Sequence, residues 1–337
     1  MENINITVEE KIHKSLLPEE RKNEILAVVR GEKLPNLYSD VIAKQVFSPD
    51  KHPERLDFIL QRIMKDKSIE TSNSASNEGL LQSMYSKKVI TDIPAWLKDH
   101  RLADLEMQVA AQEYIVNRTD IYASEMLMIQ YSAEKGQKKS ELNYSNVDGV
   151  IIIVLMKNSP KIFREFESKR YIHRITEHQA DSGIRFPLLR KMVFVQLDKA
   201  LEQFLNGDYS KDEDTELLKM LAMIADINNA KVKKETAGNT LYESIRNEIA
   251  VFSKDKENQL MLIDEMLAET DINSMRSEAI KEGRAEGRAE GRAEGQEEIS
   301  RLYAWLLDEN RLDDAKRAAS DEDFRKELLE DLYRKEQ

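Results

Sequence analysis

The stretch KVITDIPAWLKDHRLADLEMQVA, residues 88–110, decides the fold. Its two ends, KVITDI (88–93) and ADLEMQVA (103–110), alternate apolar and polar side chains, as strands with one buried face do. The segment between them contains Asp99 and His100, which suit a turn. The sequence therefore predicts an antiparallel hairpin over residues 88–110.

The segments that follow this hairpin alternate between helix and strand. Residues 111–134 return to helical spacing and are rich in Tyr, Met and Leu. The stretch GVIIIVLM, residues 149–156, is apolar on both faces, which is typical of a central, buried strand. MVFVQL, from Met192, is the last clear strand. This order predicts an α/β fold with a mixed sheet and helices on its faces.

The segments outside the sheet are predicted to be mostly helical. Apolar residues at helical spacing indicate helices over residues 7–30 and 38–64, the second interrupted near Ser48-Pro49-Asp50. The stretch SIETSNSASNEG (68–79) is either a loop or a poorly formed strand. From Gly207 the chain is helical and increasingly polar.

A low-complexity repeat, KEGRAEGRAEGRAEGQ, occupies residues 281–296. Its period of four places like charges four residues apart on a helix, and each glycine costs about 1 kcal/mol relative to alanine. The repeat is therefore a marginal helix or a flexible spacer. Residues 299–337 predict two short amphipathic helices, which are candidates to pair with a second copy of the chain.

Composition excludes several classes of protein. The 337 residues contain no cysteine, so disulfides, zinc–thiolate sites and cysteine nucleophiles are excluded. The longest apolar run, Val150 to Met156, is far shorter than the roughly 20 residues of a membrane helix. The charged N-terminus lacks the apolar stretch of a signal peptide. These features predict a cytoplasmic protein without membrane contact.

The charge balance bears on the partner. A net charge of −12 argues against a passive, nonspecific nucleic-acid binder. Residues 157–191, however, hold nine Lys or Arg against four acids. This segment is either a local patch that meets phosphate or a solvated charged surface.

Three polar side chains of the hairpin form the candidate site. Glu106 and Gln108 are two residues apart on one strand, so they project from the same face, and strand pairing brings Asp92 to that face. Two carboxylates make an oxygen-rich site for a hard cation such as Mg²⁺ or Mn²⁺. On spacing alone, acids scattered along a hairpin are the alternative interpretation.

Six short motifs follow one another over residues 36–205, and together they resemble one family, the PD-(D/E)XK nuclease family transposases, also described as recombination-promoting nucleases. Tails of EGR(A/K) repeats are likewise common in that family. The motifs are DVIAKQVF (40–47), TDI (91–93), ADLEMQ (103–108), Arg118 with Tyr122, Gln130 and Lys135-Gly136, YIH (171–173) and QLDK (196–199).

The resemblance implies a restriction-endonuclease-like fold, followed by a helical C-terminal extension, and metal-dependent hydrolysis of DNA tied to recombination or mobile elements. Asp92 and Glu106 match the family's metal-binding acids, with Mg²⁺ or Mn²⁺ as the expected cofactor and DNA as the partner. Gln108 stands where many nucleases of the superfamily have Lys. A neutral amide cannot donate a proton as an ammonium can, so Gln108 is expected to orient water or phosphate.

Five other residues have a functional and a structural interpretation each. Arg118 is placed to bind the scissile phosphate or to form an ion pair on the helix surface. Tyr122 contacts DNA or belongs to the core, and His173 is a phosphate contact, a general base or a structural residue. Asp40 supplies a further acid to the metal or caps a helix. Asp104, on the same side as Glu106, is another acid near the metal or a charge at the strand edge.

These interpretations define units along the chain and leave two functions open. Intact Asp92 and Glu106 favour an active endonuclease. The missing Lys and the acidic balance favour a catalytically inactive nucleic-acid- or protein-binding module on the same fold. The expected units are an N-terminal helical segment (1–35), the nuclease-like domain (36–205), a helical extension (206–275), the repeat spacer (276–298) and a helical tail (299–337).

Overall fold

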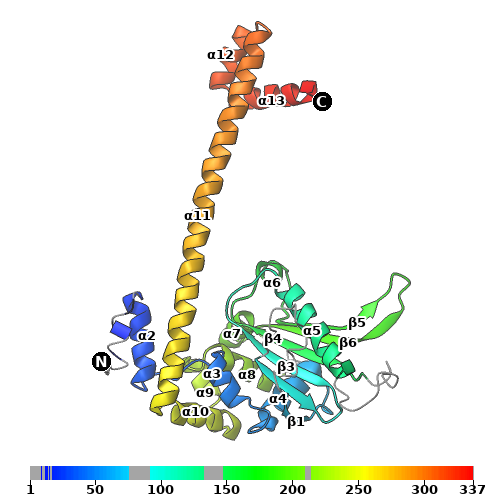
Figure 1. The fold of residues 1–337 in the computed structure, drawn as a ribbon, viewed down its shortest axis with the longest axis vertical. Helices are drawn as coiled ribbons and strands as arrows, with labels where there is room; N and C mark the ends of the chain where they lie inside the picture. Colours follow the sequence, from blue (N-terminus) through cyan, green and yellow to red (C-terminus); the bar gives the residue numbers. More distant parts are fainter. Residues whose placement is uncertain are drawn as a thin grey trace. The chain divides into compact units, whose positions relative to one another are not determined.

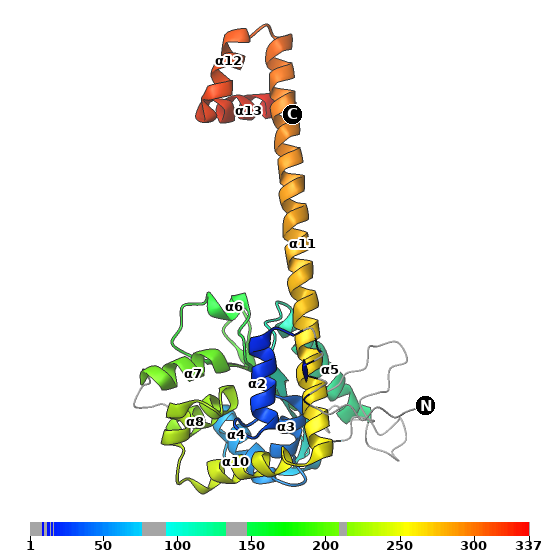
Figure 2. The same cartoon turned by 90° about the vertical axis from the view of Figure 1, so that its left-hand side faces the viewer.

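The computed structural model describes residues 9, 12, 13, 15, 17–75, 92–132, 147–208 and 214–336 (Figure 1, Figure 2). The backbone forms two compact units, residues 1–266 and residues 267–337. Parts of the expected first helix (7–30), residues 88–91 of the expected hairpin and the motif pair Lys135-Gly136 lie outside the described residues.

The first unit is built on a six-stranded mixed sheet with the order β1-β2-β3-β4-β6-β5 (Figure 1). β3, β4 and β6 are parallel neighbours, and the remaining pairs are antiparallel. The mixed sheet predicted from the sequence is confirmed, with the apolar strand at its centre. The strands are β1 (Thr71–Ser74), β2 (Ile93–Leu97), β3 (Leu102–Gln108), β4 (Val150–Met156), β5 (Ile172–Gln179) and β6 (Arg185–Gln196).

The hairpin is confirmed, but its first strand lies further along the chain than expected. β2 begins at Ile93, so Asp92 precedes this strand instead of ending it. Pro94 explains the error, because a proline has no N–H for the ladder and argues against an inner strand. Ile93 nevertheless enters the core together with Ala95 and Leu97. The turn falls where it was expected, with His100 at a φ of 66°.

Helices cover both faces of the sheet. The single long helix α5 (Ile115–Ser132) packs on one face over even-numbered residues of β3 and β4 such as Leu102 and Ile152. The opposite face holds the larger apolar core. It is covered by residues of α3 (Asp40–Val46), α4 (Pro53–Met64), α7 (Leu197–Asn206), α8 (Thr215–Ala225), α9 (Ala230–Glu235) and α10 (Thr240–Phe252).

Three local predictions are settled by these elements. The expected interruption near residues 48–50 separates α3 from α4, which begins with proline at its first helical position. Part of the Ser/Asn-rich stretch is a strand, β1. The strand β5 was not predicted, because most of its side chains are exposed and it shows no apolar alternation. Two further helices, α2 (Glu19–Val29) and the short α6 (Lys161–Arg164), complete the unit.

The amide side chain of Gln130 fastens α5 to the start of β4. Its Nε2 donates to the carbonyl of Gly149 at 2.7 Å, and its Oε1 accepts the N–H of Gly149 at 3.0 Å. Gly149 has a φ of 99°, and a Cβ there would lie 2.7 Å from the carbonyl oxygen of Leu189. Only glycine fits this position, since both the backbone angle and the close approach exclude a side chain.

The second unit contains the rest of α11 (Lys256–Asp308), then α12 (Leu312–Ser320) and α13 (Glu322–Glu336). The backbone of the EGRA repeat is helical throughout. The expectation of two short helices from residue 299 is corrected, because residues 299–308 continue α11. Leu302 and Leu306 of α11 pack with Ala318, Leu328 and Leu332. Within the described ranges, no helix combines the length and the apolar character needed to cross a bilayer.

Candidate functional site

The candidate site lies on the face of β3 that is covered by α5. Ala103, Leu105 and Met107 point into the larger apolar core on the other face. Side chains alternate along a strand, so Asp104, Glu106 and Gln108 all project toward the α5 side. All three are buried. One strand thus places two carboxyl groups and an amide in a row beneath a helix.

Asp92 enters this row from the neighbouring strand. Ile93 pairs with Leu105 in the antiparallel ladder, and Asp92 and Glu106 follow one residue beyond that pair. The Oδ2 of Asp92 accepts the N–H of Met107 at 2.6 Å, which holds its carboxylate at the end of the hairpin. Burial raises the pKa of Asp92 to about 6, helped by the negative charge of Asp40.

The two acids of β3 are more strongly perturbed. Asp104 accepts the N–H of Ile93 at 3.2 Å through Oδ1, and burial and then the charge of Asp92 raise its pKa to about 8. Burial also raises the pKa of Glu106 to about 9, followed by the charges of Asp104 and Asp92. Asp104 Oδ2 and Glu106 Oε2 are buried, with no hydrogen-bond partner among the described residues. The three carboxyl groups therefore repel one another in a place that water does not screen.

Arg118, from the first turns of α5, supplies a positive charge to this row. Its guanidinium forms an ion pair with Oε1 of Glu106 and donates to Oε1 of Gln112 at 3.1 Å. The same guanidinium lies over the ring of Tyr122, 5.3 Å from the ring centroid. Residues four apart on a helix are neighbours, so Arg118 and Tyr122 share one flank of α5.

Gln108 lies at the carboxyl end of β3. Its Nε2 donates to the carbonyl of Ala110 at 2.7 Å. This bond fixes the direction of the amide, so that its orientation is set by the chain and does not depend on a ligand.

The structure does not bring His173 to the acids. Strand pairing aligns Glu106 with Val154, Phe194 and then His173, so three strand spacings, roughly 14 Å, separate the ends of this row. The Nε2 of His173 lies 2.9 Å from Oε1 of Gln196, and its ring packs on Phe163.

Asp40 is the first residue of α3, and the preceding Ser39 is the N-cap. The carboxylate of Asp40 pairs with Lys44 at 3.4 Å. Both charges reach Asp92, where Asp40 raises the pKa and Lys44 lowers it.

Sequence reasoning missed one contributor to this arrangement. The carboxylate of Glu265, in α11, accepts the hydroxyl of Ser39 and the N–H of Asp40, both at 2.5 Å. Glu265 therefore holds the N-terminus of α3 and with it Asp40. No local signal in the sequence connects residues that are more than two hundred positions apart.

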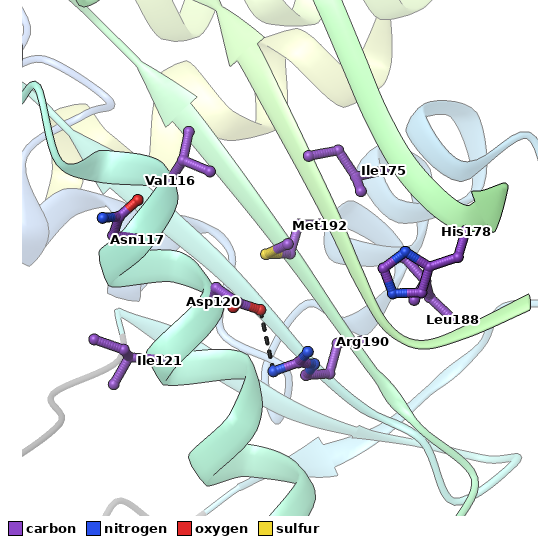
Figure 3. Close-up of a pocket in the computed structure, with 9 residues that line it drawn as sticks. All are labelled: Val116, Asn117, Asp120, Ile121, Ile175, His178, Leu188, Arg190 and Met192. Atoms are coloured by element: carbon purple, nitrogen blue, oxygen red, sulfur yellow. Dashed lines mark ion pairs between the residues drawn. The ribbon is translucent and has the colours of Figure 1, made fainter. Parts of the chain in front are cut away.

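The Lys and Arg side chains of residues 157–191 do not form one continuous patch beside the acids. The Lys157 Nζ donates to the carbonyl of Ala225, and Arg185 pairs with Glu177. Arg190 pairs with Asp120 of α5 at 3.1 Å (Figure 3). The Arg190–Asp120 pair lies across a cavity of about 390 Å³ between α5 and the strands β5 and β6. Apolar side chains of the helix and of the strands also line this cavity. Several of these charges are thus neutralised within the protein.

Two acids of the row, Asp92 and Glu106, are the residues that could hold a divalent cation. Mg²⁺ is commonly bound through one or two carboxylates and keeps several waters. In the described part of the chain, no three His, Asp or Glu side chains are arranged to enclose a metal ion. Asp92 and Glu106 would hold the cation as a pair, and the partnerless oxygen of Glu106 gives it a buried ligand.

This sheet, with its acids on a hairpin at the edge of three parallel strands, defines a restriction-endonuclease-like fold of the PD-(D/E)XK type. The family model for the PD-(D/E)XK nuclease family transposases matches residues 37–279, well over half of the chain. The chain belongs to this family, and its fold is that of a nuclease. Neither the curated proteins nor the solved structures gave a match to it.

Proposed function

We propose that this protein is a metal-dependent endonuclease that hydrolyses phosphodiester bonds of DNA, with Mg²⁺ or Mn²⁺ held by Asp92 and Glu106. The observation that carries the proposal is the row of buried, mutually repelling carboxyl groups. A buried carboxylate without a partner is costly. A site that keeps three carboxyl groups together, those of Asp104 and Glu106 buried and that of Asp92 half-buried, with pKa values raised to between about 6 and about 9, is typical of catalytic centres.

Each residue of the row has its own part in the reaction. Asp92 and Glu106 bind the cation, and Asp104 adds negative charge behind them. Gln108, whose amide is held by Ala110, orients water or the phosphate. A divalent cation bound here supplies the positive charge that acidifies water and neutralises charge on the phosphate.

Arg118 is suited to contact the phosphate that is cut. Its ion pair with Glu106 and its bond to Gln112 leave further N–H groups of the guanidinium for a ligand. A guanidinium binds phosphate oxygens in a bidentate manner, which fixes their orientation as well as their charge. Tyr122, against the same guanidinium, limits its movement.

One observation favours the second candidate, a catalytically inactive nucleic-acid- or protein-binding module. The guanidinium of Arg118 already neutralises Glu106, as a metal ion would, and Gln108 provides no positive charge. A protein that uses Arg118 in place of the cation would keep the fold and bind without cutting.

The experiment that decides between these functions is cleavage of supercoiled plasmid by the purified full-length chain. We expect nicked or linear products with Mg²⁺ or Mn²⁺ and none with EDTA. Asp92→Asn should abolish them, because it removes one of two anionic ligands. Asp313→Asn, the same change at a fully exposed acid of α12, should not. Equal cleavage by the Asp92→Asn variant would locate the activity elsewhere, and no cleavage with either ion would favour the binding module.

A further inference from the structure

A second cavity, of about 580 Å³, lies at the start of β5. β5 is an edge strand of the sheet (Figure 1). Its wall contains Arg170, His173 and Arg174, together with Ser168 and Glu167. The lining thus combines two arginines, a histidine and a serine with one glutamate and the apolar residues Phe166 and Ile172. The nuclease site uses none of these groups.

The cavity opens at the same end of the sheet as the acid row. β4 and β6 run parallel to β3, and the antiparallel β5 begins where β6 ends. Glu106 and His173 occupy the two ends of one register row, roughly 14 Å apart at three strand spacings. That separation is on the scale of the width of the DNA major groove, about 12 Å. A single duplex can therefore reach both places.

The two arginines of the cavity repel each other. Burial and then the positive charge of Arg170 lower the pKa of Arg174. Among the residues that the structure describes, neither guanidinium forms an ion pair with a carboxylate, and Arg174 donates to the carbonyl of Ile63. By contrast, the adjacent Lys169 pairs with Asp208 outside the cavity. Two arginines against the single carboxylate of Glu167 leave an excess of positive charge in the lining, which favours binding of an anion.

The cavity wall is fixed by the neighbouring helix. Lys199 and Gln203 of α7 donate to the carbonyls of Ser168 and Lys169, the two residues before Arg170. The bond from Arg174 to Ile63 fixes the second guanidinium against α4. The arginines are therefore placed before any ligand arrives, which lowers the entropy that binding must overcome.

We infer that this cavity binds a backbone phosphate of the DNA substrate, at a distance from the bond that is cut. The inference rests on the proposed function for the identity of the anion. Paired guanidinium groups suit phosphate oxygens because they offer several N–H donors in a fixed plane. Contact at this second point sets the register of the duplex on the acid row and carries no base specificity.

The test measures binding separately from cleavage. A fluorescently labelled 30-base-pair duplex is titrated with the full-length chain in EDTA, over a series of KCl concentrations. Arg170→Gln should weaken binding about tenfold and reduce the slope of log K against log[KCl] by about one, the value for one lost phosphate contact. Arg174→Lys should keep the slope, because it keeps the charge. In Mg²⁺, Arg170→Gln should raise KM and leave kcat unchanged.

Lys169→Gln is the matched control, because it removes a positive charge from the next residue but not from the cavity. If Lys169→Gln weakens binding as much as Arg170→Gln does, binding depends on the general surface charge and not on the cavity, and the inference is overturned. Binding by Arg170→Gln equal to that of the unsubstituted chain, or no binding by the unsubstituted chain at 25 mM KCl, would also overturn it. A chain that binds with the expected slopes but does not cleave would refute the endonuclease proposal alone.

Discussion

The two faces of β3 differ in chemistry although both are buried. One face carries Leu105 between two other apolar residues and packs into the larger core. The other face carries Asp104 and Glu106 beneath α5. Burying an apolar side chain stabilises the fold by about 1.5–3 kcal/mol, whereas burying an unpaired polar group destabilises it. The apolar face of this strand therefore stabilises the fold, and its titratable groups lie on the other face.

The largest effect expected from this comparison is on cleavage. Glu106→Ala should reduce the rate by at least about a thousandfold, equivalent to about 4 kcal/mol in the activation barrier. The free energy of unfolding should fall by less than it does for a truncation on the apolar face, because removal of a repelled carboxyl group offsets part of the loss of the ion pair with Arg118. Plasmid cleavage and urea unfolding of the same preparation measure both. A variant that loses activity only because it unfolds would erase the distinction between the faces.

On the apolar face, Leu105→Ala should lower the stability of the protein and leave its rate of cleavage nearly unchanged. Truncating a fully buried leucine costs about 2–5 kcal/mol of unfolding free energy, because it removes buried surface and leaves a cavity. The folded fraction should still cleave DNA at low temperature with nearly the same kcat. Urea denaturation and single-turnover cleavage at 10 °C check this expectation. A loss below 1 kcal/mol would show that this face contributes less than its burial suggests.

A smaller effect is expected at Gln108. Replacement by Ala should lower kcat about tenfold, roughly 1.4 kcal/mol, because it removes an oriented amide and no charge. Replacement by Lys should preserve or raise activity, since it places positive charge near the phosphate. The order of damage should be carboxylates first, then Gln108, then Arg118. A larger loss of kcat at Arg118 than at Glu106 would contradict the role of Glu106 as a ligand of the cation.

The last expected effect is on the free energy of unfolding, which should depend on pH because of the raised pKa of Asp104. An unfolded Asp titrates near 3.9, whereas burial raises the folded pKa to about 8, so the folded state binds more protons between these values. Stability in EDTA should therefore fall as pH rises from about 4 to about 8. Asp104→Asn removes this loss and should therefore stabilise the protein more at pH 8 than at pH 5. Thermal unfolding at both values measures the difference, with Asp313→Asn as the unaffected control.

The sequence predicted those parts of the fold in which side-chain period reports burial. β3 and β4 followed from alternation and from an apolar run, and the helix α5 from its spacing. β2 was displaced because the penalty of Pro94 in a ladder outweighed three inward apolar residues. β5 was missed because an edge strand with most of its side chains exposed leaves no hydrophobic pattern.

The candidate site shows the same division between local and long-range information. Asp92, Glu106 and Gln108 could be assigned to one face of the hairpin because strand pairing follows from local sequence, and the family resemblance singled them out as the candidate site. The ion pair between Arg118 and Glu106 depends on the rotation of α5 over the sheet, which no local pattern specifies. The contact of Glu265 with Ser39 depends on packing between distant segments.

The hydrogen bonds between Gln130 and Gly149 fix the position of α5 relative to the candidate site. Arg118 lies twelve residues before Gln130, a length of about 18 Å along a helix. Because the amide fixes one end of the helix in both height and rotation, the other end is fixed as well. Inserting one residue between them would turn Arg118 by about 100° and shift it by about 1.5 Å. The position of the Arg118 guanidinium is thus set by the number of residues between Arg118 and Gln130 in the helix.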